Sequence, residues 1–183
     1  MRKLEETKNI GILPREGSIL YNLLKSDEET RRKTLKRFKR MNKFFTIPFY
    51  KVGLLPLLGF GKIFLILTTK GRITGKMRKI PLEYRKIDDI ITIFSARGEN
   101  SDWLKNLRAN PESARVKYGF HNFKPRVEFV EDYGEKLRII KFYITNYQKA
   151  AKVLFGWKPE EDNLDTIDLS TLTKLLSIIR LHR

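Results

Sequence analysis

Two glycines and several cations lie close together between Thr68 and Tyr84, in the segment TTKGRITGKMRKIPLEY. Glycine lets backbone N–H groups approach an anion, and side chains such as Arg72, Lys76 and Arg78 can close around it. The segment therefore has the residue types of a phosphate site. The alternative is a solvated basic hairpin, because charged turns are common in proteins.

The same segment does not match the Walker loop of nucleotide-hydrolysing proteins. Three residues separate Gly71 from Gly75 where that motif needs four, and Met77 stands where the motif has Ser or Thr. We therefore do not expect nucleotide hydrolysis.

Residues for other kinds of catalysis are few. The chain has no cysteine, and its two histidines, His121 and His182, lack the spacing of metal ligands, so we expect no metal site. Tyrosines could supply a phenol to a pocket, but rings four residues apart on a helix also serve as packing residues. The tyrosines considered are Tyr84, Tyr133, Tyr143 and Tyr147.

The net charge of +17 indicates an anionic partner. Nucleic acid, an anionic membrane surface and an acidic small molecule all fit this charge. We find no recognised nucleic-acid-binding motif and expect no specific nucleic-acid partner. The N-terminus has no signal-peptide core, and the absence of cysteine is compatible with a reducing compartment, so we expect a cytoplasmic protein.

The most apolar region runs from Phe44 to Leu67, but prolines, glycines and lysines interrupt it. A membrane-spanning helix needs about 20 mostly apolar residues without such breaks. We interpret the region as short buried pieces or as a segment that lies on a membrane. The basic, aromatic N-terminal segment before it suggests peripheral membrane contact as a further hypothesis.

The surrounding pattern predicts an α+β fold, with short antiparallel strands in a barrel or sandwich. We expect an N-terminal helix that begins after Ser26 and continues to Phe45, and a single long helix that ends near Gly156. The domain prediction is a basic helical extension over residues 1–43 and a barrel domain over 44–183. The expected strands are 63–69, 77–86, 90–96, 114–119, 124–132 and 175–183. We expect Pro81 to lie at an edge or a bulge, and 114–119 to form a hairpin with 124–132. A middle helix is expected to stop before Pro111.

Two segments together resemble the deazaflavin-dependent nitroreductase family, the F420H2-dependent reductases with a split β-barrel. The first is LTTKGRITGKMRKIPLEY, and the second is FSARGENSDWLKNLRANP. The resemblance covers roughly residues 45–131. The matching positions are Gly71, Arg72, Gly75, Arg78, Pro81, Leu82, Ser95, Gly98, Trp103, Asn106, Leu107, Ala109, Asn110 and Pro111.

This resemblance implies a role for each segment in binding coenzyme F420. The glycine-containing loop would hold the cofactor phosphate, and the second segment would border the deazaflavin ring. The implied phosphate-binding residues are Arg72, Thr74, Gly75, Lys76 and Arg78, with Lys79 and Pro81 beside them. The implied ring-binding residues are Ser95, Ala96, Arg97 and Gly98, with Trp103 and Asn106 shaping the wall.

The implied activity is hydride transfer from reduced F420 to an electron-poor small molecule such as a quinone or nitro compound. Tyr84, Tyr143 and Tyr147 are the candidate proton donors. Glu83 stands where some relatives have a tyrosine near substrate, so the resemblance does not transfer acceptor specificity. The alternatives are an FMN-binding split-barrel protein and a basic nucleic-acid-binding protein without activity; sheet edges that need covering favour a homodimer.

Overall fold

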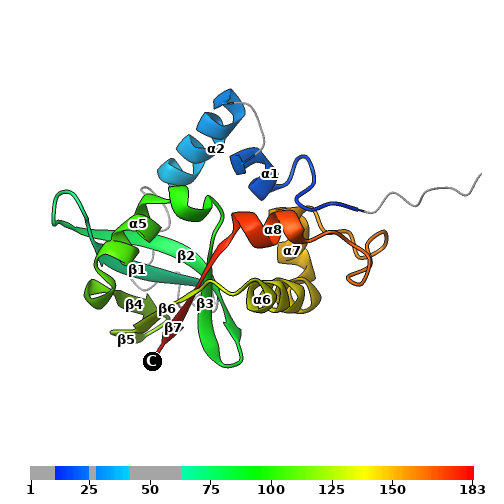
Figure 1. The fold of residues 1–183 in the computed structure, drawn as a ribbon. Coiled ribbons are helices and arrows are strands. Elements are labelled where there is room, and N and C mark those ends of the chain that lie inside the picture. The colour runs from blue at the N-terminus through cyan, green and yellow to red at the C-terminus, as the bar shows by residue number, and fades with distance from the viewer. Residues whose placement is uncertain (1–10, 25–27, 42–62) are drawn as a thin grey trace, which may run out of the picture.

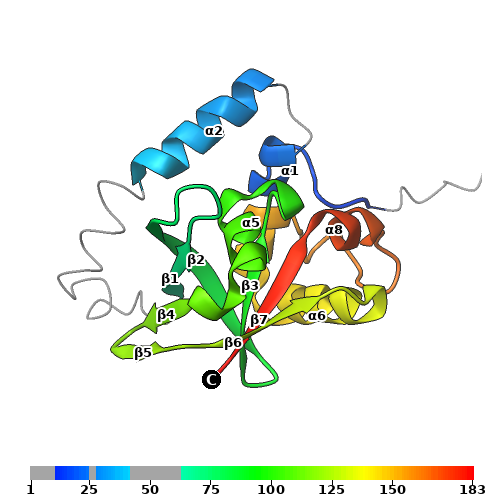
Figure 2. The same cartoon turned by 60° about the vertical axis from the view of Figure 1, so that its left-hand side comes forward.

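The structure, a computed structural model, describes residues 11–24, 28–41 and 63–183. One antiparallel sheet of seven strands, in the order β5-β4-β1-β2-β3-β7-β6, forms the centre of the described chain. Helices surround it, which confirms the α+β class (Figures 1 and 2). The strands are β1 (Phe64–Lys70), β2 (Met77–Ile87), β3 (Ile90–Ser95), β4 (Arg115–Tyr118), β5 (His121–Phe123), β6 (Arg126–Val130) and β7 (Ser177–His182).

The long strand β2 joins the two halves of the sheet and lets it curl into a split β-barrel. Its first part, Met77 to Glu83, pairs with β1, whereas its last part, Tyr84 to Ile87, pairs with β3. Pro81 lies opposite Ile66 in the first part, where the described chain provides only one neighbouring strand. The strand is an edge at this point, as expected for a proline.

The turn between β2 and β3 is a two-residue hairpin, as its Asp-Asp sequence indicates. Asp88 and Asp89 both have positive φ, at 53° and 60°. Two successive positive φ values are typical of the type I′ turn, which matches the twist of the flanking strands.

The expected hairpin between residues 114–119 and 124–132 is wrong. β4 pairs instead with the short strand β5, and β6 crosses over to pair with β7 at the C-terminus. Alternation along a strand shows which residues share a face but carries no information about which strand becomes the neighbour.

The described helices are α1 (Ile19–Leu24), α2 (Glu28–Met41), α5 (Asp102–Ala109), α6 (Tyr133–Asn146), α7 (Gln148–Phe155) and α8 (Ser170–Leu175), with 3-10 turns η3 (Gly98–Asn100) and η4 (Pro111–Ser113). We predicted one long helix that ends near Gly156. The end is confirmed, but the segment forms two helices, α6 and α7. Tyr147 breaks it, with φ −130° and ψ 48°. No proline or glycine marks this break in the sequence.

Two apolar clusters lie on opposite faces of the sheet. One contains Leu65, Leu67 and Ile93 of the sheet together with Leu104 and Leu107 of α5. The other packs the opposite face against α6, α7 and α8. Figures 1 and 2 show this division, with α5 on one side and the three C-terminal helices on the other.

Residues 11–24 pack into the second cluster. Leu13 and Leu20 are buried there, and Arg15 forms an ion pair with Asp162 at 2.6 Å. The boundary expected at residues 43–44 lies outside the described residues, so the division into extension and barrel domain stays a prediction.

α2 confirms a basic N-terminal helix between Glu28 and Met41. Both Ser26, its expected cap, and Phe45, its expected end, lie outside the described residues, as does most of the apolar region from Phe44. The last residues of that region, from Phe64, form β1. Among the described helices, none is long and apolar enough to cross a membrane.

Candidate cofactor site

The loop between β1 and β2 carries the glycines and cations singled out above. The Gly71 N–H donates to the Lys76 carbonyl, and the Gly75 N–H donates to the Gly71 carbonyl, each at 2.9 Å. Gly75 has φ +66°, a conformation that a residue with a Cβ rarely adopts. These two N–H groups are used within the loop and are not free to bind an anion.

Arg72 attaches this loop to α5. Its backbone N–H and its Nη1 both donate to Oδ1 of Asn106, at 3.1 and 3.0 Å. Its Nη2 lies 3.1 Å from Oδ1 of Asp102. The side chain of Arg72 is thus already held by the protein, and the loop and α5 form one unit.

The other cations in and directly after the loop are freer than Arg72 to bind a ligand. The side chains of Lys76 and Lys79 are exposed and have no hydrogen-bond or ion-pair partner among the described residues. The Arg78 side chain makes one long contact of 3.5 Å with the Thr74 hydroxyl. Arg78 and Lys79 are consecutive in β2, so they lie on opposite faces of the strand. Lys76, Arg78 and Thr74 can therefore bind one anion together, with Lys79 on the other face beside the buried Pro81.

The second predicted segment forms a tight turn between β3 and α5. The buried Ser95 hydroxyl donates to the Gly98 carbonyl at 2.9 Å and lies 2.7 Å from the Ser101 hydroxyl. Gly98 has φ +48°, and a Cβ there would lie 2.5 Å from the Leu175 carbonyl oxygen. Ser95 and Gly98 thus determine the shape of the turn, while Ala96 and Arg97 are partly exposed on it.

α5 follows the turn directly and places Trp103 and Asn106 beside it. Trp103 is partly buried against the apolar cluster that contains Leu104, and Asn106 is 8% exposed. The structure therefore brings together the loop, the turn and α5, which are the three segments expected to form the site.

The three candidate proton donors do not share one site. Tyr84 belongs to the cluster on the α5 side of the sheet, whereas Tyr143 and Tyr147 lie on the opposite side, with their ring centroids 5.5 Å apart. Burial, and then the neighbouring Tyr118, raises the pKa of Tyr84 above its usual value.

Tyr143 is buried and its hydroxyl donates to Oε1 of Glu83 at 2.8 Å. Burial, and then the Glu83 carboxylate, raises the pKa of Tyr143 well above its usual value. Arg85 pairs with the same Glu83 oxygen at 2.5 Å and lies 4.7 Å from the centre of the Tyr147 ring. Of the three tyrosines, only Tyr147 is partly exposed. A role as proton donor stays a prediction for each of them.

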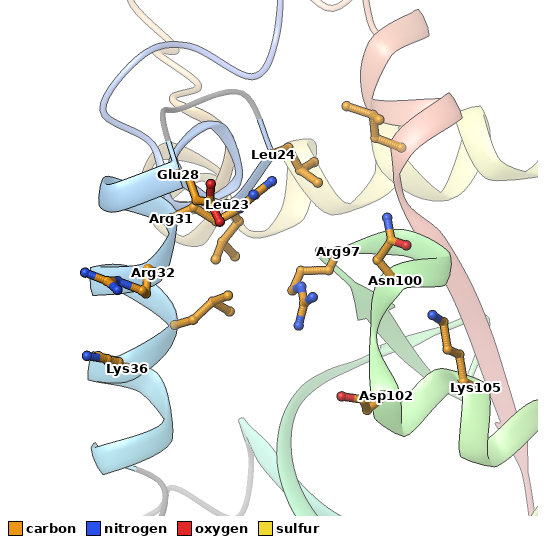
Figure 3. A pocket seen from close by; sticks show the side chains of 12 residues that line it. Leu23, Leu24, Glu28, Arg31, Arg32, Lys36, Arg97, Asn100, Asp102 and Lys105 are labelled. Atoms are coloured by element: carbon orange, nitrogen blue, oxygen red, sulfur yellow. The ribbon is translucent and has the colours of Figure 1, made fainter. Parts of the chain in front are cut away.

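A cavity of about 950 Å³ lies between α2 and the segment that contains η3 and the start of α5. Figure 3 shows Arg31 of α2 and Arg97 of the turn extending into the space between these elements. Asp102 borders this cavity and also pairs with Arg72, so the cavity adjoins the loop. The charged residues that line the cavity include Arg31, Arg32, Lys36, Arg97, Asp102 and Lys105.

Two sets of contacts were not predicted from the sequence: those of Arg72 with α5, and those of Glu83 with Arg85 and Tyr143. Asp102 and Asn106 are four residues apart and so share a face of α5, a spacing that indicates a possible common partner but does not identify it as Arg72. The Glu83–Arg85–Tyr143 cluster left no comparable signal, because α6 is distant from β2 in the chain.

Residues 55–152, more than half of the chain, match the family model of the F420H(2)-dependent quinone reductases. The fold and the joined loop and turn described above lie largely within this range. The protein is thus an oxidoreductase of the kind that uses coenzyme F420, and this chain belongs to the F420H(2)-dependent quinone reductase family.

Solved structures with similarity to the chain include an F420-H2 dependent reductase (FDR-A), at 18% identity and TM-score 0.44 over 66% of this chain and 95% of that one. A protein of Bacteroides thetaiotaomicron described as a 5-nitroimidazole antibiotic resistance protein has 11% identity and TM-score 0.44, over 67% and 74% of the chains. A pyridoxamine 5'-phosphate oxidase-related, FMN-binding protein of Nostoc punctiforme has 14% identity and TM-score 0.46, over 69% and 72%. No protein of curated function matches the sequence closely.

Proposed function

We propose that the Gly71–Lys76 loop binds the phosphate of F420 and that the turn from Ser95 to Gly98 borders its deazaflavin ring. The observation that carries this proposal is the double hydrogen bond from Arg72 to Asn106, which joins the loop to α5, the helix that directly follows the turn. A ligand that contacts both segments would therefore meet a preformed surface, and preorganisation reduces the cost of binding.

The residues present fit a phosphate. Lys76 and the Thr74 hydroxyl lie on the exposed loop, and Arg78 follows it at the start of β2. The side chains of Lys76 and Lys79 lack partners among the described residues. Arg72 is shared with Asp102 and so acts mainly by positioning the loop. Charge-assisted hydrogen bonds of this kind are stronger than those between neutral groups.

When bound, reduced F420 supplies a hydride, and the acceptor is an electron-poor small molecule of the quinone or nitro type. The chain's own contribution is orientation. Gly98 allows the turn to lie close against Leu175, and Trp103 forms part of the adjacent wall. No nucleophile or general base is required of the protein in this reaction.

The test is a titration with F420 of wild type and of the double variant Lys76→Gln/Arg78→Gln. We expect at least about a tenfold loss of F420 affinity, because two charge-assisted contacts to phosphate are removed. Lys149→Gln/Lys152→Gln removes the same charge from α7 and serves as the control. Unchanged F420 affinity in the loop variant would contradict the proposed phosphate site.

FMN is titrated in parallel, since the same type of barrel could hold that cofactor. Tight FMN binding together with no F420 binding would favour the alternative of an FMN-binding protein. F420 binding with turnover of 1,4-naphthoquinone is the expected result.

Two partner predictions accompany this function. β5 and β6 end the sheet within the described chain, and exposed strand edges favour a homodimer, which light scattering after gel filtration would measure. Peripheral membrane contact through the basic N-terminal segment is tested by liposome co-sedimentation of the full chain and of the variant Lys33→Gln/Arg37→Gln/Arg40→Gln, which removes three charges from exposed positions of α2 and leaves residues 11–24, which pack into the second apolar cluster, in place. Equal sedimentation would remove the membrane hypothesis.

A further inference from the structure

The loop between β1 and β2 carries two exposed apolar side chains. Ile73 is 84% exposed, the largest exposed fraction of any large apolar residue in the described part of the chain, and Met77 is 54% exposed. Single exposed apolar residues are ordinary on a protein surface. These two lie only four residues apart, however, and neither takes part in the phosphate site proposed above.

Lysines flank the two apolar side chains. Lys70 lies opposite Met77 in the β1–β2 ladder, so their side chains share a face of the hairpin. Lys79 follows Met77 by two residues in β2 and shares that face as well. The side chains of both lysines are exposed and have no ion-pair or hydrogen-bond partner among the described residues. We call Lys70, Ile73, Met77 and Lys79 the loop patch.

The loop patch is separate from the residues assigned to the phosphate. Arg78 lies between Met77 and Lys79 in β2, so its side chain is on the opposite face of the strand. The sequence from Thr68 to Leu82 contains no acidic residue. The positive charge of the patch is therefore not neutralised from within the hairpin.

The hydrogen bonds of the loop hold Ile73 outward. The Gly71 N–H donates to the Lys76 carbonyl and closes the loop, and the Arg72 N–H donates to Asn106 of α5. Figure 1 shows the loop projecting from the end of the β1–β2 hairpin, away from the C-terminal helices. An apolar side chain held in this way loses little conformational freedom when a partner covers it.

We propose that the loop patch is a docking surface for an anionic membrane. Ile73 and Met77 enter the interfacial region of the bilayer, and Lys70 and Lys79 bind lipid phosphates. Binding to a membrane surface increases with the apolar area that is buried and with the attraction to anionic lipids. The long apolar stems of lysine let its ammonium group stay among the headgroups. A nucleic acid would match the two lysines but would leave the aliphatic side chains uncovered.

This docking surface differs from the basic N-terminal segment, and it does not depend on the cofactor. The measurements below therefore contain no F420, so that their failure leaves the proposed function untouched. All of them use the full chain. Thermal unfolding checks that each variant is folded, which we expect because the substituted side chains are exposed.

The first test is co-sedimentation with vesicles of phosphatidylglycerol and phosphatidylcholine. The test variant is Ile73→Ser/Met77→Ser. The matched control is Phe120→Ser/Val153→Ser, which removes two apolar side chains of nearly equal exposure, 82% and 57%, from other parts of the surface. We expect the test variant to bind at least about fivefold more weakly than wild type and the control to stay within about twofold. Equal losses in the two variants would overturn the inference.

The second test concerns the charges of the patch. Lys70→Gln/Lys79→Gln removes both of them, and Lys149→Gln/Lys152→Gln removes the same charge from exposed positions of α7. We expect the patch variant to bind the anionic vesicles at least about tenfold more weakly, and the control to lose less than about threefold. Equal losses would show a general effect of net charge and would overturn the inference.

The third test locates the loop in the bilayer. The chain has no cysteine, so a single introduced cysteine can be labelled alone with the environment-sensitive dye NBD. On anionic vesicles, the emission of a label on Ile73→Cys should rise at least about twofold and be quenched by brominated acyl chains, because the label enters the interface. A label on Phe120→Cys should stay in water. A label at position 73 that also stays in water would overturn the inference, and selective loss of duplex DNA binding in Lys70→Gln/Lys79→Gln would then assign the patch to nucleic acid.

Discussion

At the scale of single residues, Asn106 connects the two segments of the candidate site. Its buried side-chain oxygen accepts hydrogen bonds from both the backbone and the side chain of Arg72. Asp102 contacts the same arginine, but its side chain is 80% exposed. The two partners of Arg72 should therefore differ in their effect on stability.

We expect Asn106→Ala to lower the free energy of unfolding by about 1–3 kcal/mol, because it leaves the Arg72 N–H without its acceptor. F420 affinity should fall as well, since the loop is no longer fixed to α5. Asp102→Asn should cost at most about 1 kcal/mol, as exposed ion pairs usually do. Urea unfolding and F420 titration measure the two quantities, and equal losses in both variants would refute this ranking.

Gly98 has a purely steric role that its backbone reveals. Gly98→Ala combines positive φ with a Cβ that would lie 2.5 Å from the Leu175 carbonyl oxygen. Gly119 also has positive φ, at 52°, but no atom lies within 4 Å of a Cβ there. We expect Gly119→Ala to cost about 1 kcal/mol and Gly98→Ala clearly more, as measured by thermal unfolding. Similar melting temperatures for the two variants would show that the close approach is relaxed in solution.

At the scale of elements, ion pairs connect the β2–β3 turn, α6 and β7. Glu135 of α6 contacts both Arg138 and Arg180, and Arg138 also pairs with Asp88 of the turn at 2.5 Å. The Arg138 guanidinium, followed by Arg180, lowers the pKa of Glu135 from 4.5 to about 2. The carboxylate therefore stabilises the fold only while it is charged.

Because the folded-state pKa of Glu135 is depressed, its stabilisation is complete above pH 4.5 and is lost as the pH falls toward 2. We expect the free energy of unfolding to decrease over this range in wild type and to decrease less steeply in Glu135→Gln. Glu112→Gln, at an exposed position without an ion pair among the described residues, should keep the wild-type slope. Urea unfolding at several pH values provides the comparison, and parallel slopes in all three proteins would contradict the assignment.

At the scale of the whole molecule, the net charge of +17 acts on every anion, not only on the cofactor. Duplex DNA should bind weakly without sequence preference, and its affinity should fall at least about tenfold between roughly 50 and 200 mM salt. Fluorescence anisotropy with two unrelated duplexes measures this. Nanomolar, sequence-selective binding at physiological salt would instead support the nucleic-acid alternative.

Much of the fold follows from local pattern. The short apolar, β-rich runs of β1 and β3, the Asp88–Asp89 turn and the position of Pro81 are all visible in the sequence, because they depend on neighbouring residues. The break at Tyr147 and the pairing of β6 with β7 are not visible, because both depend on distant segments.

The sequence by itself determined the class of the protein through its resemblance to a known family, because the matching residues, among them Gly71, Gly75, Gly98 and Trp103, lie in two short segments. Only the tertiary structure decided how these segments meet, through Arg72 and Asn106, and that the candidate tyrosines lie on opposite faces of the sheet. The physical reason is that hydrogen bonds and burial between distant residues depend on the complete packing of the chain, whereas turns and alternation depend on adjacent residues.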